Sequence, residues 1–308
     1  MTWLRNPDFS LRQLQYAVAV HEHGGFGRAA EACGVSQPSL SAQIAKLEDT
    51  LGVQLFERDG RGVRITTAGT EVLAQATAVL QSAHDLDQLA RALVDPYASV
   101  LRIGIIPTVA PYLLPAIAEG IGDKAPALRV HWLELQTERC EAMLADGQLD
   151  GMILADPPTR SGVEHDDLGW EPFLAVVPHA DPAHDAVDNQ LLASRKLLLL
   201  EDGHCLRDHT LAQCLTDTVE ESPYRGTSLA TVVQMVASGF GVTVIPQTAA
   251  PQELGRAHVR ALPFASGHVG RTLRIAWRAQ SPRAEVVREL GGIVRDALAQ
   301  ALASAEPR

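Results

Sequence analysis

The sequence predicts an α/β protein in which a winged helix-turn-helix and a long linker helix precede an α/β region. Three observations support this fold class: helical patterns interrupted by glycines near the N-terminus, an unbroken heptad repeat, and a later alternation of strand and helix patterns. We therefore expect a winged helix-turn-helix domain over residues 1–65, a linker helix over 66–95, and an α/β domain over 96–308.

Composition and charge are compatible with this division. The chain has 308 residues, of which 46% are hydrophobic and 20% charged, as in soluble proteins of two or more domains. Residues 1–65 hold seven basic and seven acidic residues, so the net charge of −11 lies entirely in the remainder. Without a long apolar run or a signal-peptide core, we expect a cytoplasmic chain that contacts no membrane.

The first 65 residues read as three helices. An amphipathic helix over 11–23 stops at two glycines, and a short helix over 26–33 follows it. Ser36 is a candidate N-cap for a third helix over 37–51. A turn between two short helices predicts a helix-turn-helix. The helix over 37–51, the third of this segment, places polar side chains toward DNA bases. The candidate DNA-binding residues of this segment are Ser36, Gln37, Pro38, Ser39, Ser41, Gln43 and Lys46.

A hairpin wing is predicted after the third helix. Strand patterns over 54–58 and 63–66 flank a turn at 59–62. Its candidate phosphate contacts are Arg58, Arg61 and Arg64. The alternative interpretation is a small helical domain with a solvated, charged hairpin.

The linker segment carries a strict heptad repeat. Apolar residues recur in steps of four and three along an alanine-rich helix over 66–94, which Asp95 and Pro96 end. Such a regular stripe predicts a dimerisation helix. Its members are Val72, Ala76, Val79, Ala83, Leu86, Ala90 and Leu93.

From Val100 the pattern alternates between strands and helices. The expected strands are 101–106, 128–135, 152–154, 174–177, 197–200, 242–245 and 273–277. The expected helices are 113–119, 137–145, 229–238 and 284–303. Because ligands of α/β folds bind beyond the carboxyl ends of strands, Thr108, Thr137 and the loop 201–205 are expected to meet in one cleft.

Cys205 and Cys214 carry the most specific chemical signal. Polar and charged neighbours of Cys205 favour an ionised sulfur, namely His204, Arg207 and Asp208, and Gly203 loosens the chain ahead of it. In one unbroken helix, nine steps of ~1.5 Å would part the two Cα atoms by roughly 13–14 Å, on opposite faces. A disulfide tolerates only about 4.4–6.8 Å, so joining this pair requires the segment to refold.

Two other interpretations apply to Cys205 and Cys214: inert buried thiols, which is the default for an arbitrary pair, and a zinc site. Cys205, His209 and Cys214 could ligate zinc, but a fourth ligand is missing, so we expect no metal. Cys33 and Cys140 lie in partly apolar helical patterns and are expected to be buried, inert thiols.

Several motifs together resemble the signature of LysR-type transcriptional regulators. The matching positions are Ala29, Ala30, 35–41, Ile44, Leu47, Glu48, Leu51, Gly52, 55–58, Thr66 and Gly69. The resemblance covers the whole chain. It implies a DNA-binding winged helix-turn-helix and a two-lobed effector domain like that of periplasmic binding proteins. It also implies duplex DNA at promoters as a partner, a homotetramer built as a dimer of dimers, and RNA polymerase as a further candidate partner.

Three stretches, 106–115, 199–208 and 227–236, resemble the OxyR group of peroxide sensors within this family. This resemblance implies that Cys205 is the peroxidatic and Cys214 the resolving cysteine. Thr108 and Thr137 would bind the peroxide together with His204 and Cys205, while His204, Arg207 and Asp208 would support the thiolate. Two departures occur: Ala110 replaces a common glycine, and Phe240, in a turn of usually small residues, is expected to alter packing behind the cleft.

The expected chemistry follows from the thiolate. Its attack on hydrogen peroxide gives a sulfenic acid, which condenses with a second thiol to a disulfide that cellular thiols can reduce. The leading hypothesis is a regulator of antioxidant genes, acting as activator or repressor, rather than an enzyme, and without a cofactor. The alternatives are a LysR-type regulator with an organic effector in the same cleft and, third, a thiol peroxidase, which the DNA-binding half fits poorly.

Overall fold

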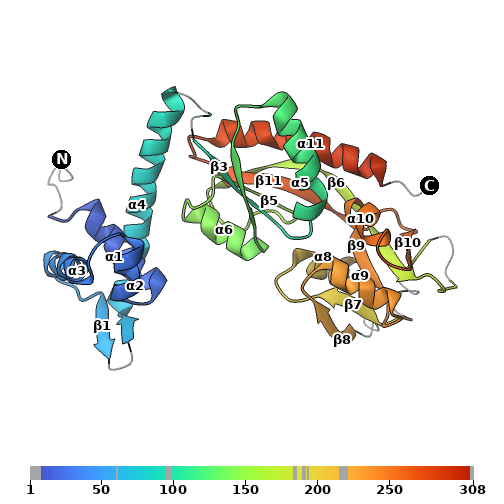
Figure 1. Ribbon diagram of the computed structural model, residues 1–308, viewed down its shortest axis with the longest axis horizontal. Helices are drawn as coiled ribbons and strands as arrows, with labels where there is room; N and C mark the ends of the chain where they lie inside the picture. The colour runs from blue at the N-terminus through green and yellow to red at the C-terminus, as the bar shows by residue number, and fades with distance from the viewer. Residues whose placement is uncertain are drawn as a thin grey trace. The chain divides into compact units, whose positions relative to one another are not determined.

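The computed structural model describes residues 8–59, 62–94, 97, 99–182, 186–188, 192, 194–214 and 221–305. The chain divides into two compact units, Met1–Gln88 and Leu89–Arg308 (Figure 1). None of the described helices combines the length and the apolar character that crossing a lipid bilayer requires.

The N-terminal unit contains the three predicted helices, α1 (Leu11–His23), α2 (Phe26–Ala32) and α3 (Gln37–Leu51). A capping box between Ser10 and Gln13 begins α1, and the Ser36 hydroxyl accepts from the backbone amide of Ser39 at the start of α3. Leu40, Ile44 and Leu47, at helical spacing, are fully buried in the shared core. The opposite face of α3 is therefore left for solvent or a partner.

The predicted wing is an antiparallel hairpin of β1 (Phe56–Asp59) and β2 (Gly62–Ile65) (Figure 1). Residues 54 and 55, expected in the first strand, precede it. They lie outside the ladder because their backbone is used elsewhere: Leu55 donates to the Glu48 carboxylate at 2.7 Å, and Gln54 accepts from the Thr66 hydroxyl at 2.7 Å. These contacts fix the wing against α3.

The long helix α4 (Thr67–Val94) was predicted to begin one residue earlier. Leu73 and Ala76 pack into the core of the N-terminal unit, whereas Val79 is 45% and Leu86 68% exposed. The heptad stripe thus leaves the core and continues as an exposed apolar stripe. Its role in dimerisation and the domain boundaries after residues 65 and 95 remain predictions.

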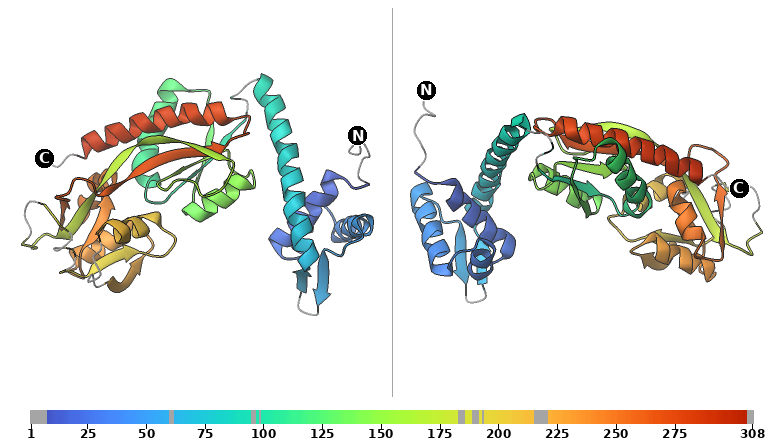
Figure 2. Two further views of the ribbon diagram at one scale, coloured as in Figure 1. Left: turned by 180° about the vertical axis from the view of Figure 1, so that it is seen from behind. Right: turned by 45° about the horizontal axis from the view of Figure 1, so that its top comes forward.

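The first lobe of the C-terminal unit is built on a sheet in the order β4-β3-β5-β11-β6. Strands β3, β4 and β5 are parallel, and β11 pairs antiparallel with β5 and β6. Helix α11 packs beside α5 on this lobe (Figures 1 and 2). The elements are β3 (Leu101–Ile105), α5 (Ala110–Lys124), β4 (Val130–Glu134), α6 (Thr137–Ala145), β5 (Gly151–Leu154), β6 (Val163–Pro178), β11 (Gly270–Arg278) and α11 (Ala284–Ser304).

The second lobe shares the long strand β6 with the first. Strands β9 and β10 pair with its C-terminal half, and β7 pairs in parallel with β8. The elements are β7 (Leu197–Leu200), α8 (Cys205–Cys214), β8 (Glu221–Gly226), α9 (Leu229–Ala237), β9 (Thr243–Pro246), η2 (Gln247–Ala249), α10 (Ala250–Leu254) and β10 (Val259–Pro263). Each lobe has its own hydrophobic core, which confirms the predicted two-lobed effector domain.

The structure extends the predicted elements where the apolar signal was weak. The expected strand at 174–177 is the end of β6, whose first half carries polar residues on an exposed face and is held by pairing with β11. Strands β8 and β10 and helix α10 were not predicted either. Their short sequences give little periodicity, and their structure depends on pairing with distant segments.

Candidate functional site

Three strand ends meet at one cavity between the lobes of the C-terminal unit. Thr108 follows β3, Thr137 begins α6 after β4, and the loop 201–205 follows β7. The cavity is closed tightly and leaves no room for a water-sized sphere. The structure therefore brings together the three segments that strand ends predicted. Its lining residues are Ile106, Pro107, Thr108, Gln136, Thr137, Gly203, His204 and Cys205.

Cys205 is the first residue of α8 and only 8% exposed. Thr137 is likewise the first residue of α6, so two helix N-termini border the cavity. The positive ends of both helix dipoles therefore favour negative charge on atoms placed there.

Arg271 is the functional residue that the sequence analysis missed. Its buried guanidinium donates to the Thr108 hydroxyl at 2.7 Å through Nη1 and to the Thr108 carbonyl at 3.0 Å through Nη2. Its Nε donates to a Glu171 carboxylate oxygen at 2.7 Å, and the Thr248 hydroxyl donates to the same carboxylate. Arg271 comes from β11, 66 positions after Cys205, so no local motif could have signalled it.

Burial and the Arg271 charge shift the pKa of the Cys205 thiol in opposite directions. Burial raises its pKa and is the largest effect, while the Arg271 charge lowers it; Asp156 raises it further. The sequence neighbours Arg207 and Asp208 do not line the cavity: Arg207 pairs with Asp202 at 3.1 Å, and Asp208 is exposed. The prediction that Arg207 and Asp208 support the thiolate is therefore corrected: the helping charge comes from β11, and the local contribution is the N-terminus of α8.

The Thr137 hydroxyl is poised over the same cavity. Its Oγ1 atom is buried and completes no hydrogen bond within the described part of the chain. It nevertheless lies near enough to the Cys205 thiol to lower the thiol pKa. The hydroxyl therefore faces both the thiol and any small polar molecule that enters the cavity.

His204 and Gly203 shape the other wall. His204 is buried, and burial lowers its pKa against the opposing charges of Glu201 and Glu134. Its imidazole is therefore neutral at physiological pH and can donate or accept a hydrogen bond. Gly203 has a φ of +93°, and a Cβ there would lie 2.8 Å from Gln136 Oε1, so glycine lets the loop close on α6.

The remaining cysteines differ in environment. Helix α8 runs unbroken to Cys214, whose side chain lies outside the described atoms; an unbroken helix was the premise of the disulfide argument. Cys140 is buried, as predicted, and burial raises its pKa to about 12. Cys33 was also predicted to be buried but is half-buried. His209, the other candidate zinc ligand, contacts Asp156 at 2.7 Å through Nε2.

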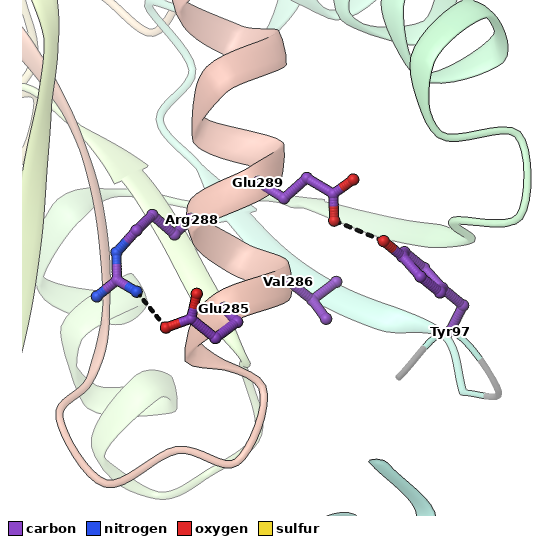
Figure 3. A pocket seen from close by; sticks show the side chains of 5 residues that line it. All are labelled: Tyr97, Glu285, Val286, Arg288 and Glu289. Atoms are coloured by element: carbon purple, nitrogen blue, oxygen red, sulfur yellow. Dashed lines mark hydrogen bonds and ion pairs between the residues drawn. The ribbon is translucent and has the colours of Figure 1, made fainter. Parts of the chain in front are cut away.

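A second pocket lies beside the start of α11 (Figure 3). Tyr97 donates to the Glu289 carboxylate at 2.6 Å, and Arg288 pairs with Glu285 at 2.6 Å. Arg288 also lies over the Trp277 ring, 4.8 Å from its centre. These contacts attach the segment after α4 to α11 and leave the pocket walls charged.

Comparisons with known proteins agree with this architecture. A profile described as bacterial regulatory helix-turn-helix protein, lysR family, matches residues 11–70, and the LysR substrate binding domain profile matches 95–299. A probable hydrogen peroxide-inducible genes activator of Mycobacterium avium is 41% identical over 285 residues, covering 91% of this chain and 92% of that protein. The DNA-binding transcriptional dual regulator OxyR of Escherichia coli K12 is 40% identical over 289 residues, covering 93% and 95%. The chain belongs to the LysR family.

Solved structures of OxyR, a LysR-family protein, resemble the whole chain. A full-length cysteine-to-aspartate variant from Pseudomonas aeruginosa matches with a TM-score of 0.75 and 36% identity, covering 94% of this chain and 96% of that one. A hydrogen peroxide-bound cysteine-to-serine variant from Corynebacterium glutamicum matches with a TM-score of 0.67 and 34% identity, covering 97% and 95%. The similarity thus extends over both the DNA-binding and the effector parts.

The LysR-type recognition helix presents most of its predicted DNA-binding residues to solvent. The exposed members are Ser36, Gln37, Pro38, Ser39, Gln43 and Lys46. Ser41 is half-buried beside the core. On the wing, Arg64 is exposed, the Arg58 side chain is not among the described atoms, and Arg61 falls outside the described residues.

The two departures from the OxyR pattern fall in different environments. Ala110 is buried at the start of α5, next to the cleft segment. Phe240 is 56% exposed in the turn between α9 and β9, so the prediction that it alters packing behind the cleft is wrong. The flanking Gly239 and Gly241 turn the chain outward there, and the aromatic ring points to solvent.

Proposed function

We propose that this LysR-family regulator senses hydrogen peroxide through Cys205. The observation that carries the proposal is a buried thiol at a helix N-terminus, facing Arg271 and two threonine hydroxyls in a tightly closed cavity. Oxidation of Cys205 and its pairing with Cys214 would remodel α8. The remodelled effector domain would then change the contacts with duplex DNA and the transcription of antioxidant genes.

The residues at the cavity can support both steps of the proposed reaction. The Cys205 thiolate attacks one peroxide oxygen, an S–O bond forms as the O–O bond breaks, and the leaving hydroxide takes a proton to become water. Hydroxyls of Thr108 and Thr137 and the neutral His204 can hold the peroxide in line and donate to the leaving oxygen. The sulfenic acid then condenses with the Cys214 thiol, giving a disulfide and a second water.

The tightness of the cavity favours peroxide over an organic effector. Sites for drug-sized ligands occupy about 300–1,000 Å³, whereas this space has no room for even a water-sized sphere, so a much smaller opening admits peroxide than a drug-sized ligand. Its polar lining, including the buried Thr137 hydroxyl, suits a molecule that both donates and accepts hydrogen bonds. The similarity to the peroxide-bound OxyR structure supports the same choice.

The proposal extends to the assembly. The exposed apolar stripe of α4 supports a homo-oligomer, and the family resemblance supports a tetramer that contacts RNA polymerase at promoters in the cytoplasm. The site works without a bound cofactor, because the thiol itself is the reactive group.

The deciding experiment combines Cys205→Ser with a peptide map. We expect peroxide to give a 205–214 disulfide in the wild-type chain, and Cys205→Ser to abolish the transcriptional response while DNA binding persists. Cys140→Ser is the matched control, because that buried thiol has a pKa near 12 and should not react. A normal peroxide response in Cys205→Ser would instead favour an organic effector.

A further inference from the structure

Helix α8 is fastened along one face by polar contacts that the peroxide chemistry does not use. Cys205, His209 and Gln213 follow at intervals of four residues, so they share that face. His209 Nε2 lies 2.7 Å from Asp156 Oδ1, just beyond the end of β5 in the first lobe. One turn later, the Gln213 amide donates to the Gly270 carbonyl and accepts from the Gly270 amide, each at 2.8 Å.

Gly270, the partner of Gln213, lies in a tightly packed part of the sheet. Gly270 is buried at the start of β11, and a Cβ there would lie 2.5 Å from the Glu171 carbonyl. Its backbone is therefore packed tightly, directly before Arg271. The Gln213 amide satisfies both backbone groups of Gly270, so the end of α8 is tied to the strand that carries Arg271.

We propose that Gln213 and His209 form a clamp, the α8 clamp, that stabilises the reduced helix and so sets how readily the 205–214 disulfide forms. The inference rests on the proposed function, because it concerns the step after Cys205 is oxidised. In an intact helix the two cysteines stand about 13–14 Å apart, so α8 must leave both anchors before sulfenic acid and thiol can meet. The clamp contributes to the reduced state alone, and both residues are positioning residues.

The test uses Gln213→Met in the full-length protein. Methionine keeps the length and helix preference of glutamine and removes both hydrogen bonds. In the reduced protein, we expect amide hydrogen exchange over 209–214 to become about tenfold faster. In thiol redox buffers, we expect the equilibrium to move about tenfold toward the disulfide, a potential about 30 mV more negative. Sulfenic acid formation, measured with Cys214→Ser as background, should keep its rate.

Two further variants serve as a control and as an independent test. Gln234→Met removes a similar amide bond, to the Arg256 carbonyl at 2.8 Å, outside α8 and should change neither quantity. His209→Leu removes the other anchor and should shift the amide exchange rate and the redox potential in the same direction. It therefore provides an independent test if Gln213→Met folds poorly.

Two results would overturn the clamp: unchanged exchange in the reduced protein, or a potential that stays constant or rises. If peroxide gives no 205–214 disulfide in the wild-type chain, the proposed function fails. The exchange measurement still tests the clamp in that case, because it requires no oxidation.

Discussion

Arg271 and Glu171 form a fully buried ion pair beside the Cys205 thiol. The distance from Arg271 Nε to the Glu171 carboxylate oxygen is 2.7 Å. A buried pair is stable when further hydrogen bonds satisfy both groups, and here Thr108 and Thr248 do so. The guanidinium is thereby fixed where it can stabilise a thiolate that burial disfavours. At the scale of the residue, reactivity depends on this balance between burial and one placed charge.

We predict that Arg271→Met slows the reaction of Cys205 with peroxide by about 100-fold near neutral pH, as does loss of other positioned charged donors. Because burial already raises the thiol pKa, the wild-type rate should climb as pH rises through the neutral range. Without Arg271 the pKa rises further, so the climb moves to higher pH. Stopped-flow rates between pH 6 and about 9 test this.

The matched control is Arg274→Met, on the same strand, whose side chain pairs with Asp167 and not with the cleft. Its rate–pH profile should follow the wild type. An Arg271→Met profile that coincides with the wild type would refute the assigned role.

At the scale of the element, α4 combines two functions along its length. Its first part completes the core of the DNA-binding unit through Leu73 and Ala76, and its later part presents Val79 and Leu86 to solvent. Exposed apolar residues in a heptad pattern are the usual seam between two helices. We therefore propose this stripe as the surface that a second copy of the chain covers.

We predict that Leu86→Glu lowers the oligomeric state, because a charge in the seam would be desolvated. Leu86 is 68% exposed, so the fold of a single chain should survive the substitution. Sedimentation velocity measures the outcome. Ser82→Glu, an exposed position outside the stripe, is the control; equal effects of both changes would argue against the seam.

At the scale of the whole molecule, redox chemistry in the C-terminal unit has to alter DNA contacts of the N-terminal unit. The acidic excess lies outside residues 1–65, so the DNA-binding unit meets phosphates with local basic groups. Arg64 on β2 is an exposed example. The two units thus divide sensing from DNA binding.

We predict that Arg64→Ala weakens binding to specific and nonspecific duplex DNA alike. The slope of log K against log salt should fall in magnitude by about one, because one phosphate contact is lost. Fluorescence anisotropy titrations at several salt concentrations measure it. Arg12→Ala, at a residue whose side chain contacts Tyr16, should leave the slope unchanged; a sequence-selective loss in Arg64→Ala would instead indicate base contact.

Sequence patterns by themselves determined the helices of the DNA-binding unit, the heptad helix, the α/β class of the C-terminal region and the cleft residues Thr108, Thr137 and Cys205, while its two lobes were implied by the family resemblance. These features depend on spacing within short segments, which a linear pattern records. Only the tertiary structure revealed Arg271, the Gln213 contact with Gly270 and the exposed position of Phe240. Charge effects and hydrogen bonds act through space, and the pairing of β11 with β6 places Arg271 opposite Glu171, far from Cys205 in the sequence.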